Sequence, residues 1–151
     1  MSAEIMIVLG SSSDLPVTEK GVALLKELGV PFELRICSAH RTPDMLHGIV
    51  EEFEVNGGKT YICVAGMSAH LAGVVASLSV KPVLAVPVYR PETAGLDSLL
   101  SMGQMPAGIP VATLGLGKHG FTNAALTAIQ MLAISNVELE EKLKGHRITQ
   151  A

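Results

Sequence analysis

The sequence predicts an α/β protein in which a parallel sheet is covered by helices. Short apolar runs alternate five times with segments of helical periodicity, and the loops that join them are short. The first run, residues 5–9, is apolar throughout, as expected of a strand buried on both faces. Loops rich in glycine, serine and histidine follow the strands. Because ligands bind at the carboxyl ends of the strands in such sheets, these loops should meet at one functional edge.

The strands are predicted from apolar, β-type runs that end in turn residues. These runs cover residues 5–9, 32–37, 61–65, 83–86 and 109–114. The last of them contains Pro110 near its start, a position where a strand tolerates proline.

The helices are predicted from apolar residues at helical spacing. At the second helix, the hydroxyl of Thr42 can serve as the N-cap, and Pro43 suits the first helical position. The predicted helices cover residues 15–28, 42–55, a short segment ending at 78, 94–102, 121–134, and a final segment that Ser135 or Asn136 can cap and that runs through 144.

Length and composition predict one globular domain, residues 1–151. The 151-residue chain is 48% hydrophobic and 17% charged, which excludes disorder and predicts a sizeable core. The formal net charge is −3 and no basic block is present, so the sequence has no electrostatic footprint for nucleic acid. Aromatic residues make up 3% of the chain and tryptophan is absent, which removes the stacking surfaces that single-strand binders use.

The termini and cysteines predict a cytoplasmic protein. The chain starts without the basic and long apolar regions of a signal peptide, and no apolar run reaches the roughly 18 residues of a membrane span. Cys37 and Cys63 fit a reduced, intracellular protein, although their spacing leaves a bridge between them open.

The segment from residue 123 to 133 is apolar on almost all sides. A helix without a polar face is usually enclosed on several sides, and in a chain of this size a subunit interface would supply that cover. The alternative is a helix that is central to a single domain.

The loop Gly10-Ser11-Ser12-Ser13-Asp14 is the first candidate binding element. Glycine allows close approach to the backbone, and serine hydroxyls with helix-end N–H groups can hold phosphate. Asp14 can accept hydrogen bonds from ribose hydroxyls, or it can simply cap the following helix.

The segment Ser38-Ala39-His40-Arg41-Thr42-Pro43-Asp44 is the second. It places a titratable His40 beside the permanent cation of Arg41 in a strand-to-helix loop, which favours an anionic substrate. The alternative is a capped loop that carries two polar residues by chance.

The third candidate loop is Gly66-Met67-Ser68-Ala69-His70. His70 either contacts a substrate or begins the next helix with its ring in solvent. Lys118 and His119 follow the fifth strand and can reach the same edge. No pair or cluster of residues has metal-ligand spacing, so the sequence predicts no metal site. The strained elbow of serine hydrolases is also missing, which argues against Ser-His-Asp catalysis.

Two non-enzymatic α/β modules were weighed. A receiver-type signalling module needs an acidic residue at the end of the third strand, where this chain has Ala65-Gly66. A flavodoxin-like electron carrier needs aromatic cover for a flavin, and the strand-end loops offer only Tyr89 and Phe121. A receiver-like or nucleotide-binding α/β module stands as the non-enzyme alternative.

Six motifs, in order and at matching spacing, resemble the PurE family of purine biosynthesis over nearly the whole chain. They are Gly-Ser-x-Ser-Asp at 10–14, Ser-Ala-His-Arg-Thr-Pro-Asp at 38–44, Ala-His-Leu at 69–71, Gly-Leu-Asp-Ser-Leu at 95–99, Gln-Met-Pro-x-Gly-Ile-Pro-Val at 104–111 and Asn-Ala-Ala-Leu at 123–126.

The resemblance implies a three-layer α/β/α sandwich of flavodoxin- or Rossmann-like type, assembled as a homo-octamer and using no cofactor. The implied substrate is a carboxylated aminoimidazole ribonucleotide. The resemblance implies that Ser11, Ser13 and Arg41 bind the phosphate and that Asp14 binds the ribose. It implies that the base and the migrating carboxyl group are bound by Ser38, Gly66, Ser68 and His70. His40 is implied to be the catalytic residue that carries the proton.

The family has two branches. His40-Arg41-Thr42-Pro43 and Ala69-His70-Leu71 resemble the branch that moves the carboxylate of N5-carboxyaminoimidazole ribonucleotide to C4. The loop from Ala65 to Gly73 is shorter than is usual in that branch, and its length and serine resemble the branch that carboxylates aminoimidazole ribonucleotide directly with CO2. Met67 and Ala69, however, stand where that second branch has Arg and Asn. We therefore take the mutase as the main hypothesis and the carboxylase as its alternative.

Overall fold

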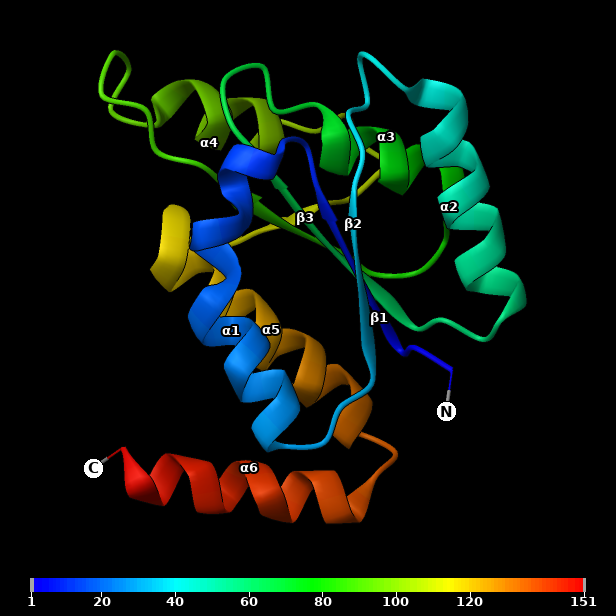
Figure 1. The fold of residues 1–151 in the computed structure, drawn as a ribbon, viewed down its shortest axis with the longest axis vertical. Helices are drawn as coiled ribbons and strands as arrows, with labels where there is room; N and C mark the ends of the chain where they lie inside the picture. Colours follow the sequence, from blue (N-terminus) through cyan, green and yellow to red (C-terminus); the bar gives the residue numbers. More distant parts are fainter. Residues whose placement is uncertain (1, 151) are drawn as a thin grey trace.

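The computed structural model describes residues 2–150 and contains one five-stranded parallel sheet (Figure 1). The strand order is β2-β1-β3-β4-β5. This is the doubly wound, flavodoxin-like order, in which the chain reverses direction across the sheet between β1 and β3. The strands are β1 (Ile5–Leu9), β2 (Phe32–Ile36), β3 (Thr60–Ala65), β4 (Val83–Pro87) and β5 (Ala112–Thr113).

Helices cover both faces of the sheet, which confirms the three-layer α/β/α sandwich. Alternate side chains of β1 enter two separate cores, because successive residues of a strand point to opposite faces. Ile5, Ile7 and Leu9 pack with α1 (Leu15–Glu27), α5 (Gly117–Ala133) and α6 (Val137–Thr149). Met6 and Val8 pack with α2 (Pro43–Val55), α3 (Leu71–Leu78) and α4 (Leu96–Gly103).

The fifth strand is much shorter than the predicted segment 109–114. Only Ala112 and Thr113 pair with β4. Pro110 has no N–H to donate to a ladder, and the N–H of Ile109 is turned back to the carbonyl of Pro106 at 3.2 Å. The apolar residues before Ala112 pack against the core as a loop instead.

The enclosure of α5 comes from its own chain. The helix lies against α1, α6 and the sheet, and its buried residues belong to one of the two cores (Figure 1). The apolar pattern of residues 123–133 is therefore explained without a second subunit. Asn136 caps α6 as predicted, because its Oδ1 accepts the N–H of Leu139 at 3.1 Å.

The predicted cap of α2 was wrong in its details. Thr42 is the N-cap residue and Pro43 the first helical residue, but no side chain caps the helix. The hydroxyl of Thr42 donates to the carbonyl of Ser38 at 3.0 Å instead. Thr42 thus closes the preceding loop rather than the helix.

Cys37 and Cys63 are both free and buried in this structure. Burial raises the pKa of the Cys63 thiol. Within residues 2–150, no helix is long and apolar enough to cross a membrane, and no group of three or more His, Cys, Asp or Glu side chains is placed to hold a metal ion.

Candidate active site

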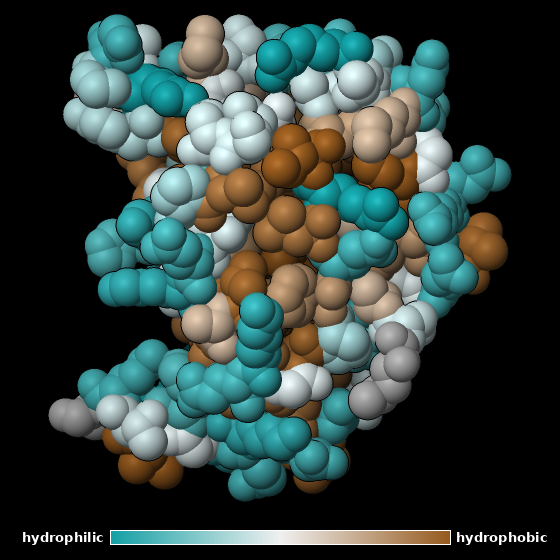
Figure 2. Space-filling view, viewed as in Figure 1, coloured by the Kyte–Doolittle hydropathy of each residue, from teal (hydrophilic) through white to brown (hydrophobic). Residues whose placement is uncertain are grey.

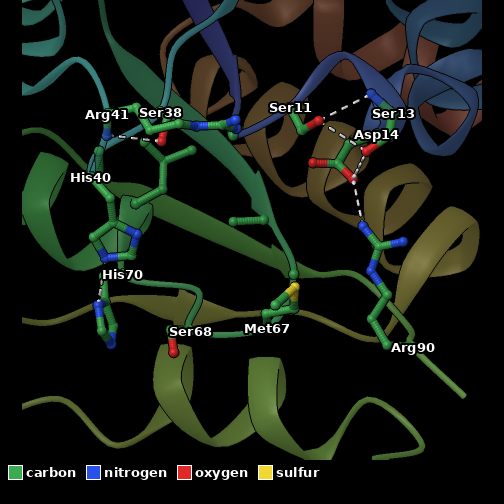
Figure 3. Close-up of a pocket in the computed structure, with 15 residues that line it drawn as sticks. Ser11, Ser13, Asp14, Ser38, His40, Arg41, Met67, Ser68, His70 and Arg90 are labelled. Carbon is green, nitrogen blue, oxygen red and sulfur yellow. Dashed lines mark hydrogen bonds and ion pairs between the residues drawn. The ribbon is translucent and has the colours of Figure 1, made fainter. Parts of the chain in front are cut away.

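A cavity of about 470 Å³ lies at the carboxyl ends of β1 to β4, next to the reversal between β1 and β3. Its size is in the range of small-molecule sites. Nine residues proposed for the site from the sequence line it, and Figure 3 shows that they come from the loops after β1, β2 and β3. These residues are Ser11, Ser13, Asp14, Ser38, His40, Arg41, Gly66, Ser68 and His70.

The turn after β1 forms one wall of the cavity. Ser11 accepts hydrogen bonds from the N–H of Ser13 at 3.3 Å and from the hydroxyl of Ser13 at 2.9 Å. A short 3-10 helix, Ser12–Asp14, follows Ser11 and leads directly into α1. The two hydroxyls are thus held together at the start of a helical segment, an arrangement suited to an anionic oxygen.

Asp14 lies in this turn and is almost completely buried. It occupies the N-cap position of α1, but its side chain makes no capping hydrogen bond, so a capping role does not explain it. The carboxylate is instead 3.9 Å from Nη2 of Arg90 and accepts a long hydrogen bond, 3.5 Å, from the hydroxyl of Ser13. Burial raises the pKa of Asp14, whereas the charge of Arg90 and the hydrogen bond from Ser13 act in the opposite direction.

The loop after β2 forms the opposite wall. Ser38 anchors it with two groups: its hydroxyl accepts the N–H of Arg41 at 3.2 Å, and its carbonyl accepts the N–H of Thr42 at 2.9 Å. The guanidinium of Arg41 extends from this loop toward Ser11 (Figure 3). The guanidinium of Arg41, from the loop after β2, and the hydroxyls of Ser11 and Ser13, from the turn after β1, therefore approach the same part of the cavity. This combination suits a phosphate group.

His40 and His70 form a direct contact that joins two loops 30 residues apart in sequence. Nε2 of His40 lies 2.8 Å from Nδ1 of His70, and the rings meet edge to face at 86°. One ring must donate and the other accept, so the tautomer of each histidine fixes that of the other. His70 begins α3, but its ring faces His40 and does not simply point into solvent.

The loop between β3 and α3 is held by α4. The hydroxyl of Ser101 accepts the N–H of Ala69 at 3.1 Å and donates to the carbonyl of Met67 at 3.4 Å. Met67 has a φ of 58°, a left-handed conformation that is costly for a residue with a side chain. Its side chain is exposed. The backbone of this loop is therefore fixed in a strained shape beside the two histidines.

Arg90 was missed in the sequence, and two other basic residues did not reach the site. Arg90 follows β4 and lines the cavity, as the rule that functional residues follow parallel strands would have indicated. Its loop matches no motif, so nothing in the sequence singled it out. Lys118 pairs with Glu19 at 3.7 Å, and neither Lys118 nor His119 is among the described residues that line the cavity.

Comparison with known proteins places this chain in a family. A family model described as AIR carboxylase matches residues 4–151. A protein named N5-carboxyaminoimidazole ribonucleotide mutase from Methanocaldococcus jannaschii is 49% identical over 95% of this chain and 87% of its own length. Its namesake from Escherichia coli is 45% identical over 98% of this chain and 88% of its own.

A solved structure agrees with both relatives. The crystal structure of Treponema denticola PurE superposes with a TM-score of 0.88 at 31% identity, over 97% of this chain and 90% of that one. The fold, the matched length and the sequence identity point the same way as the motifs did. The chain belongs to the AIR carboxylase family, the PurE family that its motifs resemble.

Proposed function

We propose that the protein is an N5-carboxyaminoimidazole ribonucleotide mutase of purine biosynthesis. The observation that carries the proposal is that His40 shares one cavity with the Ser11–Asp14 turn and Arg41, in a chain 49% identical to a protein of that name. The description of the family names a carboxylase, but two relatives that match over at least 93% of this chain, at 49% and 47% identity, are both named mutases. Those names favour the mutase over direct carboxylation.

The walls of the cavity suit the two ends of such a nucleotide. Ser11, Ser13 and Arg41 would bind the phosphate, since they combine hydroxyl donors with a guanidinium. Asp14 would accept hydrogen bonds from the ribose. The base and its carboxyl group would lie between Ser38 and the loop that carries Gly66, Ser68 and His70.

His40 would carry the proton. The carbamate N–C bond breaks and releases CO2, and the nitrogen takes up a proton. C4 of the imidazole then attacks the CO2 that the cavity retains, and it must lose its hydrogen to restore the aromatic ring. One group that gives the first proton and removes the second leaves the overall reaction balanced. We assign this task to His40, which lines the cavity, and its contact with His70, which would orient the ring, supports the assignment.

The direct test supplies each substrate to the purified protein. N5-carboxyaminoimidazole ribonucleotide should be converted at a rate that added bicarbonate does not raise. 5-Aminoimidazole ribonucleotide should react only slowly, even with bicarbonate. Fast, bicarbonate-dependent carboxylation of the second compound, without turnover of the first, would assign the protein to the carboxylase branch instead.

A histidine variant tests the proton carrier. His40→Asn should lower kcat by about 10²- to 10⁴-fold, because general acid–base catalysis is lost, while substrate still binds. His47→Asn is the matched control, since His47 is an exposed histidine on α2 that does not line the cavity. If His40→Asn retained near-normal turnover, another group would have to move the proton.

We further propose a cytoplasmic homo-octamer. The edge strand β2 is partly exposed, and Ile36 at its end is 43% accessible. Figure 2 shows apolar residues gathered on the middle of the face where β2 runs in front. An open, apolar sheet edge supports association with another subunit. Light scattering should give eight times the 15.8 kDa chain mass, and a monomer would contradict the octamer.

A further inference from the structure

Arg90 is a charged cavity residue that the family motifs do not include. Within residues 2–150, the acids and arginines that line the cavity are Asp14, Arg41 and Arg90, and the first two belong to motifs shared with the family. Arg90 comes from the loop after β4 and reaches into the cavity from there. In Figure 3 it lies beside Asp14, on the other side of the cavity from His40 and His70.

The contact between Arg90 and Asp14 is an ion pair that leaves hydrogen-bonding capacity unused. At 3.9 Å, Nη2 is attracted by the carboxylate of Asp14 but is too far away for a hydrogen bond. The carboxylate side chain is 3% exposed, so the attraction is screened less than it would be at the surface. Burial raises the pKa of Asp14, and the charge of Arg90 opposes that rise, so the pair favours the ionised form, in which a carboxylate accepts hydrogen bonds best.

The Nε atom of Arg90 is buried and has no hydrogen-bond partner within residues 2–150. It packs over Gly66: a Cβ at that position would lie 3.4 Å from Nε and 3.3 Å from Cβ of Val88. Leaving a buried donor unpaired is costly, and such groups in proteins call for a specific explanation. Because Nε is covered by the protein, the donors of Arg90 that a ligand can reach are its Nη atoms.

The charge of the cavity also depends on Arg90. Without it, the negative Asp14 would cancel the positive Arg41, and the cavity would offer no net attraction to an anion apart from its histidines. A nucleotide phosphate carries about 1.5 to 2 negative charges near neutral pH. Arg90 therefore makes an acidic residue compatible with a site for a phosphorylated substrate.

We propose that Arg90 is a further nucleotide-binding residue of this site: its Nη2 holds the Asp14 carboxylate, and the other Nη atom of the partly exposed guanidinium donates to an oxygen of the ribose phosphate. This inference rests on the proposed function for the identity of the nucleotide. It adds a second guanidinium to the site and gives Asp14 a partner that directs it toward the ribose.

The test measures binding in matched variants. Arg90→Gln should weaken the binding of 5-aminoimidazole ribonucleotide about 10- to 100-fold, the range expected for a lost charge-assisted hydrogen bond. The KM for the carboxylated substrate should rise similarly, while kcat changes less than about threefold, because His40 is untouched. Arg90→Lys should restore only part of the binding, because a lysine has no fork of donors. Arg35→Gln is the control: Arg35 pairs with Glu33, has a 42% exposed side chain against 41% for Arg90, and lies outside the cavity.

A double variant and a second probe keep the inference separate from the proposed function. In an Asp14→Asn background, the effect of Arg90→Gln should shrink, since the two residues act together. Ribose 5-phosphate, which has no base, should also bind more weakly to Arg90→Gln than to Arg35→Gln. If Arg90→Gln bound ribose 5-phosphate more weakly but the wild-type protein showed no mutase turnover, the proposed function would be rejected and the role of Arg90 would stand. Normal turnover with equal binding of both probes by Arg90→Gln and the wild type would overturn the role of Arg90 alone.

Discussion

Replacing His70 with alanine should slow the reaction without disturbing the fold. The change removes the hydrogen bond, 2.8 Å long, that joins Nδ1 of His70 to Nε2 of His40. A hydrogen bond between neutral groups contributes about 0.5 to 1.5 kcal/mol, which corresponds to a factor of about 2 to 13. The ring of His70 is exposed, so its removal leaves no cavity in the core, and the free energy of unfolding should fall by no more than the lost bond contributes, about 0.5 to 1.5 kcal/mol.

The assay is steady-state turnover of N5-carboxyaminoimidazole ribonucleotide, together with urea unfolding of each variant. We expect kcat to fall about three- to tenfold in His70→Ala, with little change in KM. The double variant with His40→Asn should be no slower than His40→Asn alone, because an orienting bond has no effect once the group it orients is gone.

Two results would refute this reasoning. A loss in His70→Ala as large as that in His40→Asn would mean that His70 itself reacts with the substrate. A rise in KM at unchanged kcat would mean that His70 binds the substrate and does not orient His40.

Two further pairs of variants test the segments around the cavity by urea unfolding. Met67→Gly should stabilise the protein by about 0.5 to 1 kcal/mol, because glycine adopts the φ of 58° at this position without strain. Ala94→Gly, at a φ of 53°, should act in the same direction. If both variants were less stable than the wild type, the backbone at these two positions would not be strained. Ser98→Ala should lower the free energy of unfolding by about 1 to 3 kcal/mol, since Ser98 is fully buried and donates to the carbonyl of Val88 at 2.8 Å. Ser77 is exposed, so Ser77→Ala should lower it by less than about 0.5 kcal/mol. Equal losses of stability in the two variants would show that burial does not set the size of the effect.

Most of the fold was predictable because uninterrupted apolar runs in the sequence indicate strands that are buried on both faces. Residues 5–9 are apolar without interruption, and β1 covers the same residues with every side chain buried. The failure at β5 has the same kind of cause, because Pro110 removes a donor that a longer strand would need. The cap at Thr42 failed because its hydroxyl had two possible acceptors, and sequence alone could not decide between them.

The site was predictable as a set of loops but not as a set of contacts. Parallel strands bring their carboxyl ends to one edge, so the loops after β1, β2 and β3 had to meet. The pairing of His40 with His70 depends on the distance between two loops, and the pairing of Asp14 with Arg90 depends on the path of a long side chain over Gly66. Neither is a property of local sequence.

Helix α4 connects the two loops on which these contacts depend. Ser98 and Ser101 lie three residues apart and so share one face of the helix. Ser98 donates to the carbonyl of Val88, at the start of the loop that carries Arg90, and Ser101 holds Ala69, next to His70. The motif at residues 95–99 contributes no residue to the described cavity lining. Its Ser98 nevertheless fixes the loop that carries Arg90, which does line the cavity. We conclude that this part of the family pattern supports the site, and that a change in α4 would affect the nucleotide-binding and the proton-transfer sides of the cavity together.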